Sequence, residues 1–136
     1  MATKAATLRW TGEGLSFGAD DYGGPSLFID SAGSAGPSPM DALLMGVAGC
    51  MAIDVLMIAQ KSRVEISAMV VEAEGHRAES DPRRFESLRL VYRLSGPAES
   101  DGAKIRRAID LSREKYCSAL HSIRDDIELD ISFELD

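Results

Sequence analysis

An almost uninterrupted apolar stretch, from Ala42 to Ala59, is the feature that most constrains the fold, and Asp54 is its only charged residue. The residues just before it are typical of a helix start. Ser38 can cap a free backbone N–H, Pro39 suits the first helical position, and Asp41 can reach back to complete a capping box. Because no polar face can be drawn on this helix, we expect protein to surround it.

The length of the stretch is near the lower limit for a membrane span. A charge at its centre, several glycine and alanine residues, and half-polar strands predicted on both sides favour a helix inside a small domain instead. The chain of 136 residues is predicted to be a single domain, residues 1–136. A domain this small cannot easily wrap such a helix alone, so we expect a partner subunit.

The charge and composition of the chain argue against several classes of function. The formal net charge of −7 argues against a nucleic-acid partner and against docking on an anionic membrane. The first ten residues lack the apolar core of a signal peptide, so we expect a cytoplasmic protein. Two cysteines in a cytoplasmic chain are unsuited to a permanent structural bridge. Each is therefore either an inert buried thiol or half of a redox couple.

The rest of the sequence predicts strands and one further helix. Strands with alternating apolar residues are expected at residues 7–11, 15–17, 27–29, 69–74, 85–94 and 127–135. An amphipathic helix is expected from Ser100 or Asp101, with one stripe formed by Ile105, Ala108, Ile109, Ser112 and Tyr116. A short helical turn is expected from Ser118 to Ile123. This order lacks regular strand–helix alternation, so it favours an α+β fold with antiparallel sheet packed on helices.

Two segments around the cysteines resemble signatures of the OsmC/Ohr family. The first is Gly36–Asp41, with the sequence GPSPMD, followed nine residues later by Cys50 in the apolar helix. The second runs from Lys104 to Ser118 and contains Cys117. Between them, Pro82–Phe85 leads into an alternating strand that also matches. The resemblance extends from about Thr7 to Phe133, and the order and spacing of the motifs make it specific.

The resemblance implies an intertwined homodimer in which antiparallel sheets wrap around long central helices, with the active sites at the subunit interface. It also implies a thiol-dependent reductase of hydroperoxides, preferring organic ones. A thiolate matching Cys50 attacks the O–O bond and becomes a sulfenic acid, with which a thiol matching Cys117 condenses. A dithiol reductant, such as a lipoylated protein, then restores the pair. No cofactor is implied.

This sequence departs from the family pattern at the groups that activate the thiolate. Peroxidase members carry an arginine on the first hairpin and a glutamate near the start of the central helix. Those positions fall near Gly12–Glu13 and on Met40, while Asp41 belongs to a different helix face. Arg9 is the only basic residue of that hairpin. A cation about 5 Å from a thiolate is worth roughly 3 kcal/mol, so its loss predicts a slow nucleophile.

Other polar residues near the cysteines in sequence are candidate modulators. Asp54 follows Cys50 by one helical turn, where it would repel a thiolate if charged, or orient the thiol if protonated. His121, four residues after Cys117, is a candidate proton shuttle, although surface packing is the commoner role. A zinc site built from both cysteines with His76 and His121 lacks paired-ligand spacing, so we expect no metal site.

A second function class stays open at this point. The same fold could bind or sense an apolar ligand at the dimer interface, with Cys50 a buried or slow thiol. Methionines in and around the apolar helix could line such a pocket, or could accept the tail of an alkyl hydroperoxide. Retention of both cysteines favours the enzyme, and loss of the arginine and glutamate favours the binding protein. Consumption of peroxide in the presence of a dithiol discriminates the two.

Overall fold

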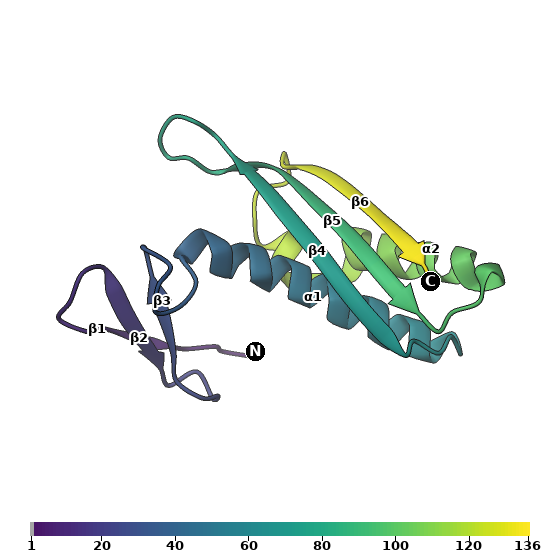
Figure 1. The fold of residues 1–136 in the computed structure, drawn as a ribbon, viewed down its shortest axis with the longest axis horizontal. Helices are drawn as coiled ribbons and strands as arrows, with labels where there is room; N and C mark the ends of the chain where they lie inside the picture. The colour runs from purple at the N-terminus through teal and green to yellow at the C-terminus, as the bar shows by residue number, and fades with distance from the viewer. Residues whose placement is uncertain (1) are drawn as a thin grey trace. The chain divides into compact units, whose positions relative to one another are not determined.

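The computed structural model describes residues 2–136, which form two compact units divided between Leu43 and Leu44. Figure 1 shows the ribbon of both units. The first contains one antiparallel sheet in the order β1-β2-β3. Its strands are β1 (Thr7–Trp10), β2 (Ser16–Asp20) and β3 (Leu27–Asp30). The three strands predicted before the apolar helix are therefore confirmed.

Polar side chains fix the backbone just before the long helix α1 (Pro39–Lys61) and at its first turn. The Asp30 carboxylate accepts hydrogen bonds from the backbone N–H groups of Ala32 and Ala35, at 3.0 Å each, which fixes the loop after β3. Ser38 Oγ then accepts the N–H of Asp41 at 3.2 Å and donates to its carboxylate at 2.9 Å. The helix start predicted at Ser38–Asp41 is confirmed, with the acid bonded to the serine hydroxyl.

A three-stranded sheet in the order β4-β5-β6 dominates the second unit. Its strands are β4 (Ala68–Arg77), β5 (Phe85–Ser95) and β6 (Glu128–Leu135). β4 and β5 pair antiparallel as expected, but β6 runs parallel to β5, so the expectation of an antiparallel sheet is wrong for this one pair of strands. The reason is the connection: the chain leaves β5, passes through helices, and returns to the end of the sheet where β5 began.

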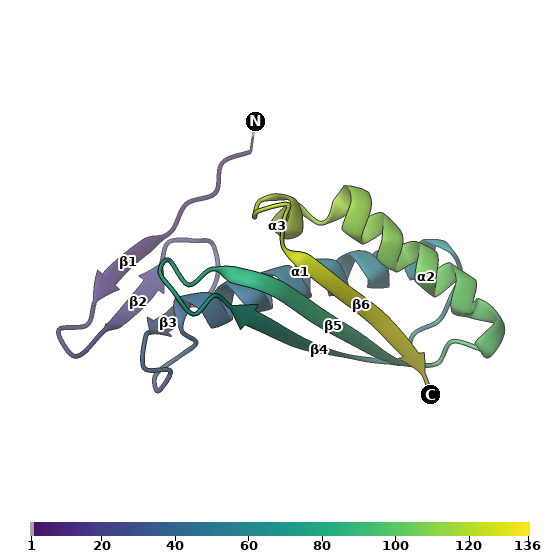
Figure 2. The same cartoon turned by 90° about the horizontal axis from the view of Figure 1, so that it is seen from above.

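Helices cover one face of this sheet (Figures 1 and 2). They are the α1 residues of this unit and a second group: η1 (Glu99–Asp101), α2 (Gly102–Leu111), η2 (Ser112–Tyr116) and α3 (Ser118–His121). The core lies between sheet and helices, and its fully buried side chains include Met51, Val55, Leu88, Leu90, Tyr92, Leu94, Ile105 and Ile109. The α+β fold class predicted from the sequence is confirmed.

One turn of the second helical group departs from the sequence prediction. Residues Ser112–Tyr116 form a π-helical turn, closed by a 2.9 Å hydrogen bond from the Cys117 N–H to the Ser112 carbonyl. The wider turn shifts the helix face by one position. Tyr116, predicted to lie on the buried stripe, is therefore 50% exposed, and Cys117 is buried instead.

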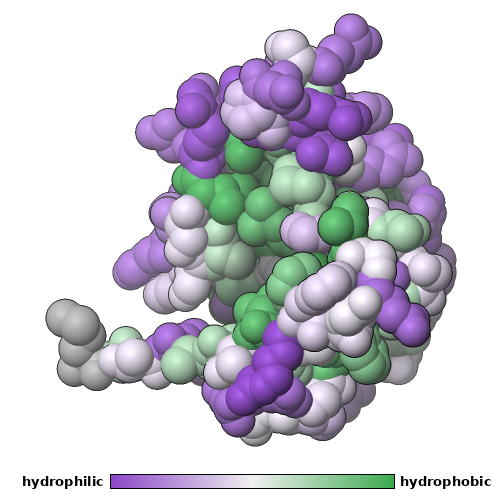
Figure 3. Space-filling model, turned by 90° about the vertical axis from the view of Figure 1, so that its left-hand side faces the viewer, coloured by the Kyte–Doolittle hydropathy of each residue, from purple (hydrophilic) through white to green (hydrophobic). Residues whose placement is uncertain are grey.

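The apolar helix α1 is only partly covered within one chain. A stripe made by Val47, Met51, Val55 and Ala59 is buried. Met45 and Ile53 are each 60% exposed and Met57 is 51% exposed. By length and composition alone α1 could cross a membrane, and 28% of its most apolar window is buried in this chain. Figure 3 shows hydrophobic residues reaching the surface on one face, bordered by hydrophilic ones.

Candidate active site

Helix α1 carries two of the polar groups that form the site. Cys50 and Asp54 are one helical turn apart, so their side chains lie on the same face. Both are half-buried, next to the fully buried Met51 and Val55. The helix therefore presents a thiol and a carboxylate side by side at the border of the core.

The second thiol comes from the end of the π-helical turn. Cys117 is fully buried, and its N–H is held by the Ser112 carbonyl. Its backbone then turns to an extended conformation, and Cys117 becomes the N-cap of α3. The Sγ atom accepts a 3.3 Å hydrogen bond from the N–H of Leu120. These two contacts fix both the backbone and the side chain of this cysteine.

The structure brings the two cysteines and Asp54 together. The two Sγ atoms and a carboxylate oxygen of Asp54 all lie within 4.8 Å of one another, and both thiols are free. Ser112 joins this cluster, because its hydroxyl donates a 2.9 Å hydrogen bond to Oδ2 of Asp54. Residues far apart in the sequence thus form one compact polar cluster beside the core.

The electrostatics of the cluster disfavour a thiolate at Cys117. Burial is the main cause that raises the pKa of this thiol to about 11, and contact with Cys50 and the charge of Asp54 act in the same direction. The hydrogen bond from Leu120 opposes them and lowers the pKa. Among the described residues, no cation contributes to this balance. Cys117 is therefore a protonated thiol at neutral pH.

Tyr92 is a site residue that the sequence analysis missed. It lies on β5, is fully buried, and its hydroxyl has no hydrogen-bond partner among residues 2–136. Burial raises the pKa of Tyr92, and the nearby Cys117 and Asp54 raise it further. A buried hydroxyl without a partner costs about 1–3 kcal/mol. The sequence predicted a strand over residues 85–94, but no sequence signal placed the Tyr92 hydroxyl near Cys117 and Asp54.

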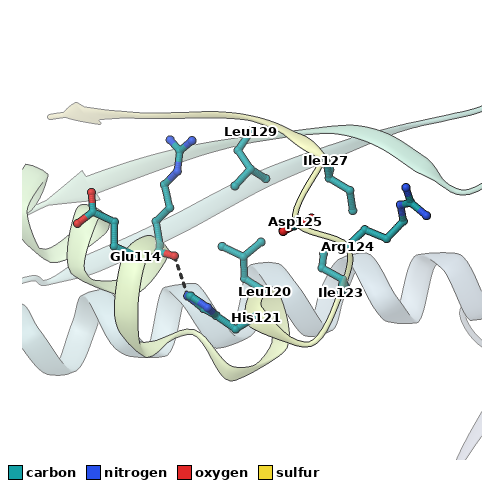
Figure 4. A pocket seen from close by; sticks show the side chains of 9 residues that line it. Glu114, Leu120, His121, Ile123, Arg124, Asp125, Ile127 and Leu129 are labelled. Atoms are coloured by element: carbon teal, nitrogen blue, oxygen red, sulfur yellow. Dashed lines mark hydrogen bonds between the residues drawn. The ribbon is translucent and has the colours of Figure 1, made fainter.

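The other predicted modulators lie in different surroundings. His121 is exposed, and its Nε2 atom lies 3.0 Å from the Arg113 carbonyl oxygen. It lines an open pocket of about 380 Å³ whose lining residues do not include the cysteines (Figure 4). Asp41 is exposed and bonds to Ser38. Arg9 is exposed on β1 and forms no salt bridge among the described residues.

Comparison with known proteins assigns the family. The model of a family described as OsmC-like protein matches residues 31–132, which include both cysteines, Asp54, Tyr92 and Ser112. The chain belongs to the OsmC-like protein family. This OsmC-like protein is 36% identical over 131 residues to the protein YhfA of Escherichia coli strain K12, and the match covers 96% of each chain.

Solved structures agree with the fold of this OsmC-like protein. The crystal structure of a hypothetical protein from Aquifex aeolicus VF5 matches with a TM-score of 0.88 and 27% identity, covering 100% of this chain and 98% of that chain. The organic hydroperoxide resistance protein OhrB of Bacillus subtilis matches with a TM-score of 0.62 and 22% identity, covering 99% and 98%. The likeness to OhrB shows the fold alone.

Proposed function

We propose that this OsmC-like protein is a dithiol-dependent reductase of hydroperoxides, with Cys50 as the nucleophile and Cys117 as the resolving thiol. The observation that carries the proposal is the proximity of two free thiols, with Sγ atoms within 4.8 Å, that lie far apart in the sequence. Solved relatives of the same fold are named organic hydroperoxide resistance proteins, which supports the substrate class.

The exposure of the two cysteines supports this division of roles. Cys50 is half-buried, whereas Cys117 is fully buried and has a raised pKa. A peroxide arriving from solvent meets Cys50 first. A second thiol that stays protonated and buried avoids direct oxidation, yet it lies close enough to trap the product of the first step.

The proposed reaction consists of three steps. The Cys50 thiolate attacks the outer oxygen of the hydroperoxide, the O–O bond breaks, and the alkoxide takes a proton to leave as an alcohol. The thiolate of Cys117, once its proton is lost, attacks the sulfenic sulfur of Cys50, forming a disulfide and releasing water after protonation. An external dithiol then reduces the disulfide and is itself oxidised to a disulfide.

Tyr92 is the proposed hydrogen-bond donor for the breaking O–O bond. Its hydroxyl is buried without a partner beside Cys117 and Asp54, and a peroxide oxygen would provide one. In the described part of the chain, no cation acts on the Cys117 thiol, whereas the family resemblance implies a cation that activates the thiolate of peroxidase members. A donor to the developing alkoxide would lower the same barrier from the other side.

A second copy of this chain is the proposed partner. The exposed apolar side chains of α1, Met45, Ile53 and Met57, would be covered in a homodimer. Such a contact would also complete the surroundings of Cys50, which is half-buried on the same helix.

The deciding experiment measures consumption of cumene hydroperoxide by the reduced protein with dihydrolipoamide as reductant. The wild type should turn over, Cys50→Ser should be inactive, and Cys117→Ser should react once and then stop. Peptide mapping of the wild type after one equivalent of peroxide should find a Cys50–Cys117 disulfide. Absence of turnover by the wild type rejects the proposal.

Absence of turnover would favour the second candidate, a protein that binds or senses an apolar ligand on the same fold. The observation in its favour is electrostatic: within residues 2–136, no cation acts on the Cys117 thiol to favour its thiolate. An apolar fluorescent probe that binds the unreactive wild type, and is displaced by fatty acids, would support this candidate.

A further inference from the structure

The arrangement of donor atoms in the cluster is suited to a second kind of chemistry. Cys50 and Asp54 lie on one turn of α1, and Cys117 approaches them from the π-helical turn. Their three donor atoms, two sulfurs and one carboxylate oxygen, lie within 4.8 Å of one another. We propose that the reduced protein binds one Zn²⁺ ion through Cys50, Asp54 and Cys117, and that oxidation of the two thiols releases it.

The distances in the cluster support a tetrahedral site. Zinc–sulfur bonds of about 2.3 Å and zinc–oxygen bonds of about 2.0–2.2 Å place neighbouring donors roughly 3.4–3.8 Å apart. All three donors lie within 4.8 Å of one another, so no separation has to close by more than about 1 Å. Side-chain rotation of the half-buried Cys50 and Asp54 can provide this movement without shifting the helix.

The nature of the donors selects the metal. Thiolates prefer soft or borderline cations, and a carboxylate beside them favours Zn²⁺ over Cu⁺. Three protein ligands would leave a fourth position for water, as in zinc sites with an open coordination position. Two thiolates and one carboxylate carry three negative charges that repel one another, and a dication offsets two of them.

The hydrogen bond from Ser112 supports the role of Asp54 as a ligand. Metal-binding carboxylates are commonly held by hydrogen bonds from neighbouring groups, which orient the remaining oxygen toward the ion. Here the buried Ser112 hydroxyl donates to Oδ2 of Asp54 at 2.9 Å, leaving Oδ1 free of side-chain donors among the described residues. The unpartnered Tyr92 hydroxyl beside the cluster provides a further polar group for a bound water.

Metal binding would slow peroxide reduction at this site. Binding displaces one proton from each thiol and occupies the sulfur electron pair that attacks a peroxide. When a hydroperoxide oxidises the zinc-bound pair, two thiolates, two protons and the hydroperoxide give a disulfide, an alcohol, water and free Zn²⁺. The disulfide has no thiolate left to bind the metal. Zinc would therefore protect the reduced pair, and its release would report oxidation.

The test is anaerobic titration of the reduced, full-length protein with Co²⁺, which replaces zinc and gives sulfur-to-metal charge-transfer absorption when thiolates coordinate it. We expect one ion per chain, with Zn²⁺ displacing it. Cys50→Ser and Cys117→Ser should each abolish the charge-transfer band or halve it. Asp54→Asn should weaken binding by about 10- to 100-fold, and Ser112→Ala by about tenfold.

Two matched controls make the assignment specific. His121→Ala and His76→Ala remove the remaining histidines, both exposed, and should leave Co²⁺ binding unchanged. Binding that survives Cys117→Ser at full intensity, or that Asp54→Asn does not weaken in a variant with unchanged circular dichroism, overturns the proposed ligand set. Binding by the oxidised protein as tight as by the reduced one overturns the redox release.

This inference stands apart from the proposed function, although both use the same thiols. The metal measurement contains no peroxide and no reductant cycle. A protein that consumes peroxide but gives no thiolate–cobalt band rejects the zinc site alone. A protein that binds the metal as proposed but fails to consume peroxide rejects the reductase alone.

Discussion

The hydroxyl of Ser112 donates a 2.9 Å hydrogen bond to Oδ2 of Asp54, 58 residues earlier in the chain. The carbonyl oxygen of the same serine accepts the N–H of Cys117 at 2.9 Å. Ser112 is fully buried, so neither contact competes with water. One residue thus contacts both the carboxylate of α1 and the residue that carries the second thiol, and a change of the Ser112 side chain removes only the contact with Asp54.

Replacing Ser112 by alanine should lower the free energy of unfolding by about 1–2 kcal/mol, because a half-buried carboxylate oxygen loses its donor. Urea denaturation of the reduced protein measures the change. Ser122→Ala is the matched control, since that hydroxyl donates to the Ser118 carbonyl at the exposed end of α3. Equal losses in the two variants would contradict a special role for the Ser112–Asp54 contact.

Tyr92→Phe should make the protein more stable and less active. Removing a buried hydroxyl that has no partner should raise the free energy of unfolding by about 1 kcal/mol. The same change should lower kcat/KM for cumene hydroperoxide by about 10- to 100-fold, because the donor to the leaving oxygen is lost. Alkylation of Cys50 by iodoacetamide, which needs no such donor, should stay at the wild-type rate. A variant that is both stable and fully active would remove Tyr92 from the mechanism.

Asp54→Asn should accelerate alkylation of Cys50 by iodoacetamide at neutral pH, in a Cys117→Ser background. The carboxylate lies within 4.8 Å of the sulfur atoms, so a negative charge there opposes formation of a thiolate. The gain should be at most about tenfold, since solvent screens part of the charge and a less basic thiolate is a weaker nucleophile. A slower reaction in Asp54→Asn would instead indicate that the carboxylate acts as a base or orients the thiol.

The step that forms the disulfide should depend steeply on pH. Burial and its neighbours raise the pKa of Cys117 above the ordinary value for a thiol, so the protonated form dominates at neutral pH. Because the thiolate is the attacking species, resolution of the Cys50 sulfenic acid should accelerate by about tenfold per pH unit between pH 7 and 9. Stopped-flow pH jumps on protein oxidised by one equivalent of peroxide measure this rate. A rate that does not change over this range would mean that Cys117 is already ionised.

Light scattering should find a dimer at micromolar concentration. Ile53 is 60% exposed in one chain and belongs to the apolar surface that the dimer would cover. Ile53→Glu should therefore shift the population toward monomer, because it would place a charge in that interface. Arg107→Glu, a charge change on the exposed face of α2, is the control and should leave the mass unchanged. A folded wild-type monomer at this concentration would reject the proposed partner.

Local patterns were enough to predict most of the fold from the sequence. The residues Ser38 and Asp41 predicted where α1 begins, and alternating apolar residues predicted the strands on both sides of it. The direction of β6 could not be predicted in this way, because alternation is the same in a parallel and an antiparallel strand. The π-helical turn was missed because the stripe from Ile105 to Ser112 fits a regular helix up to the turn itself.

The candidate site was predicted only where a resemblance or a local spacing pointed to it. The family signatures indicated Cys50 and Cys117, and the spacing of one helical turn indicated Asp54. Ser112 entered as a member of the apolar stripe and of the second signature, and Tyr92 only as part of the strand predicted at residues 85–94. The contacts that make them part of the site cross from one element to another. Hydrogen bonds between residues tens of positions apart leave no periodic trace in a sequence.

The π-helical turn also determines whether the chain tolerates an insertion or a deletion of one residue just before Cys117. An α-helix advances by about 100° per residue, and a π-helical turn accommodates one additional residue while the segments on either side keep their alignment. Deleting one residue between Arg113 and Tyr116 would convert the turn to an ordinary helical one and leave the following thiol in the same place. Inserting one residue would instead rotate that thiol away from Asp54. Gaps of one residue just before the second cysteine should therefore be tolerated as deletions and selected against as insertions.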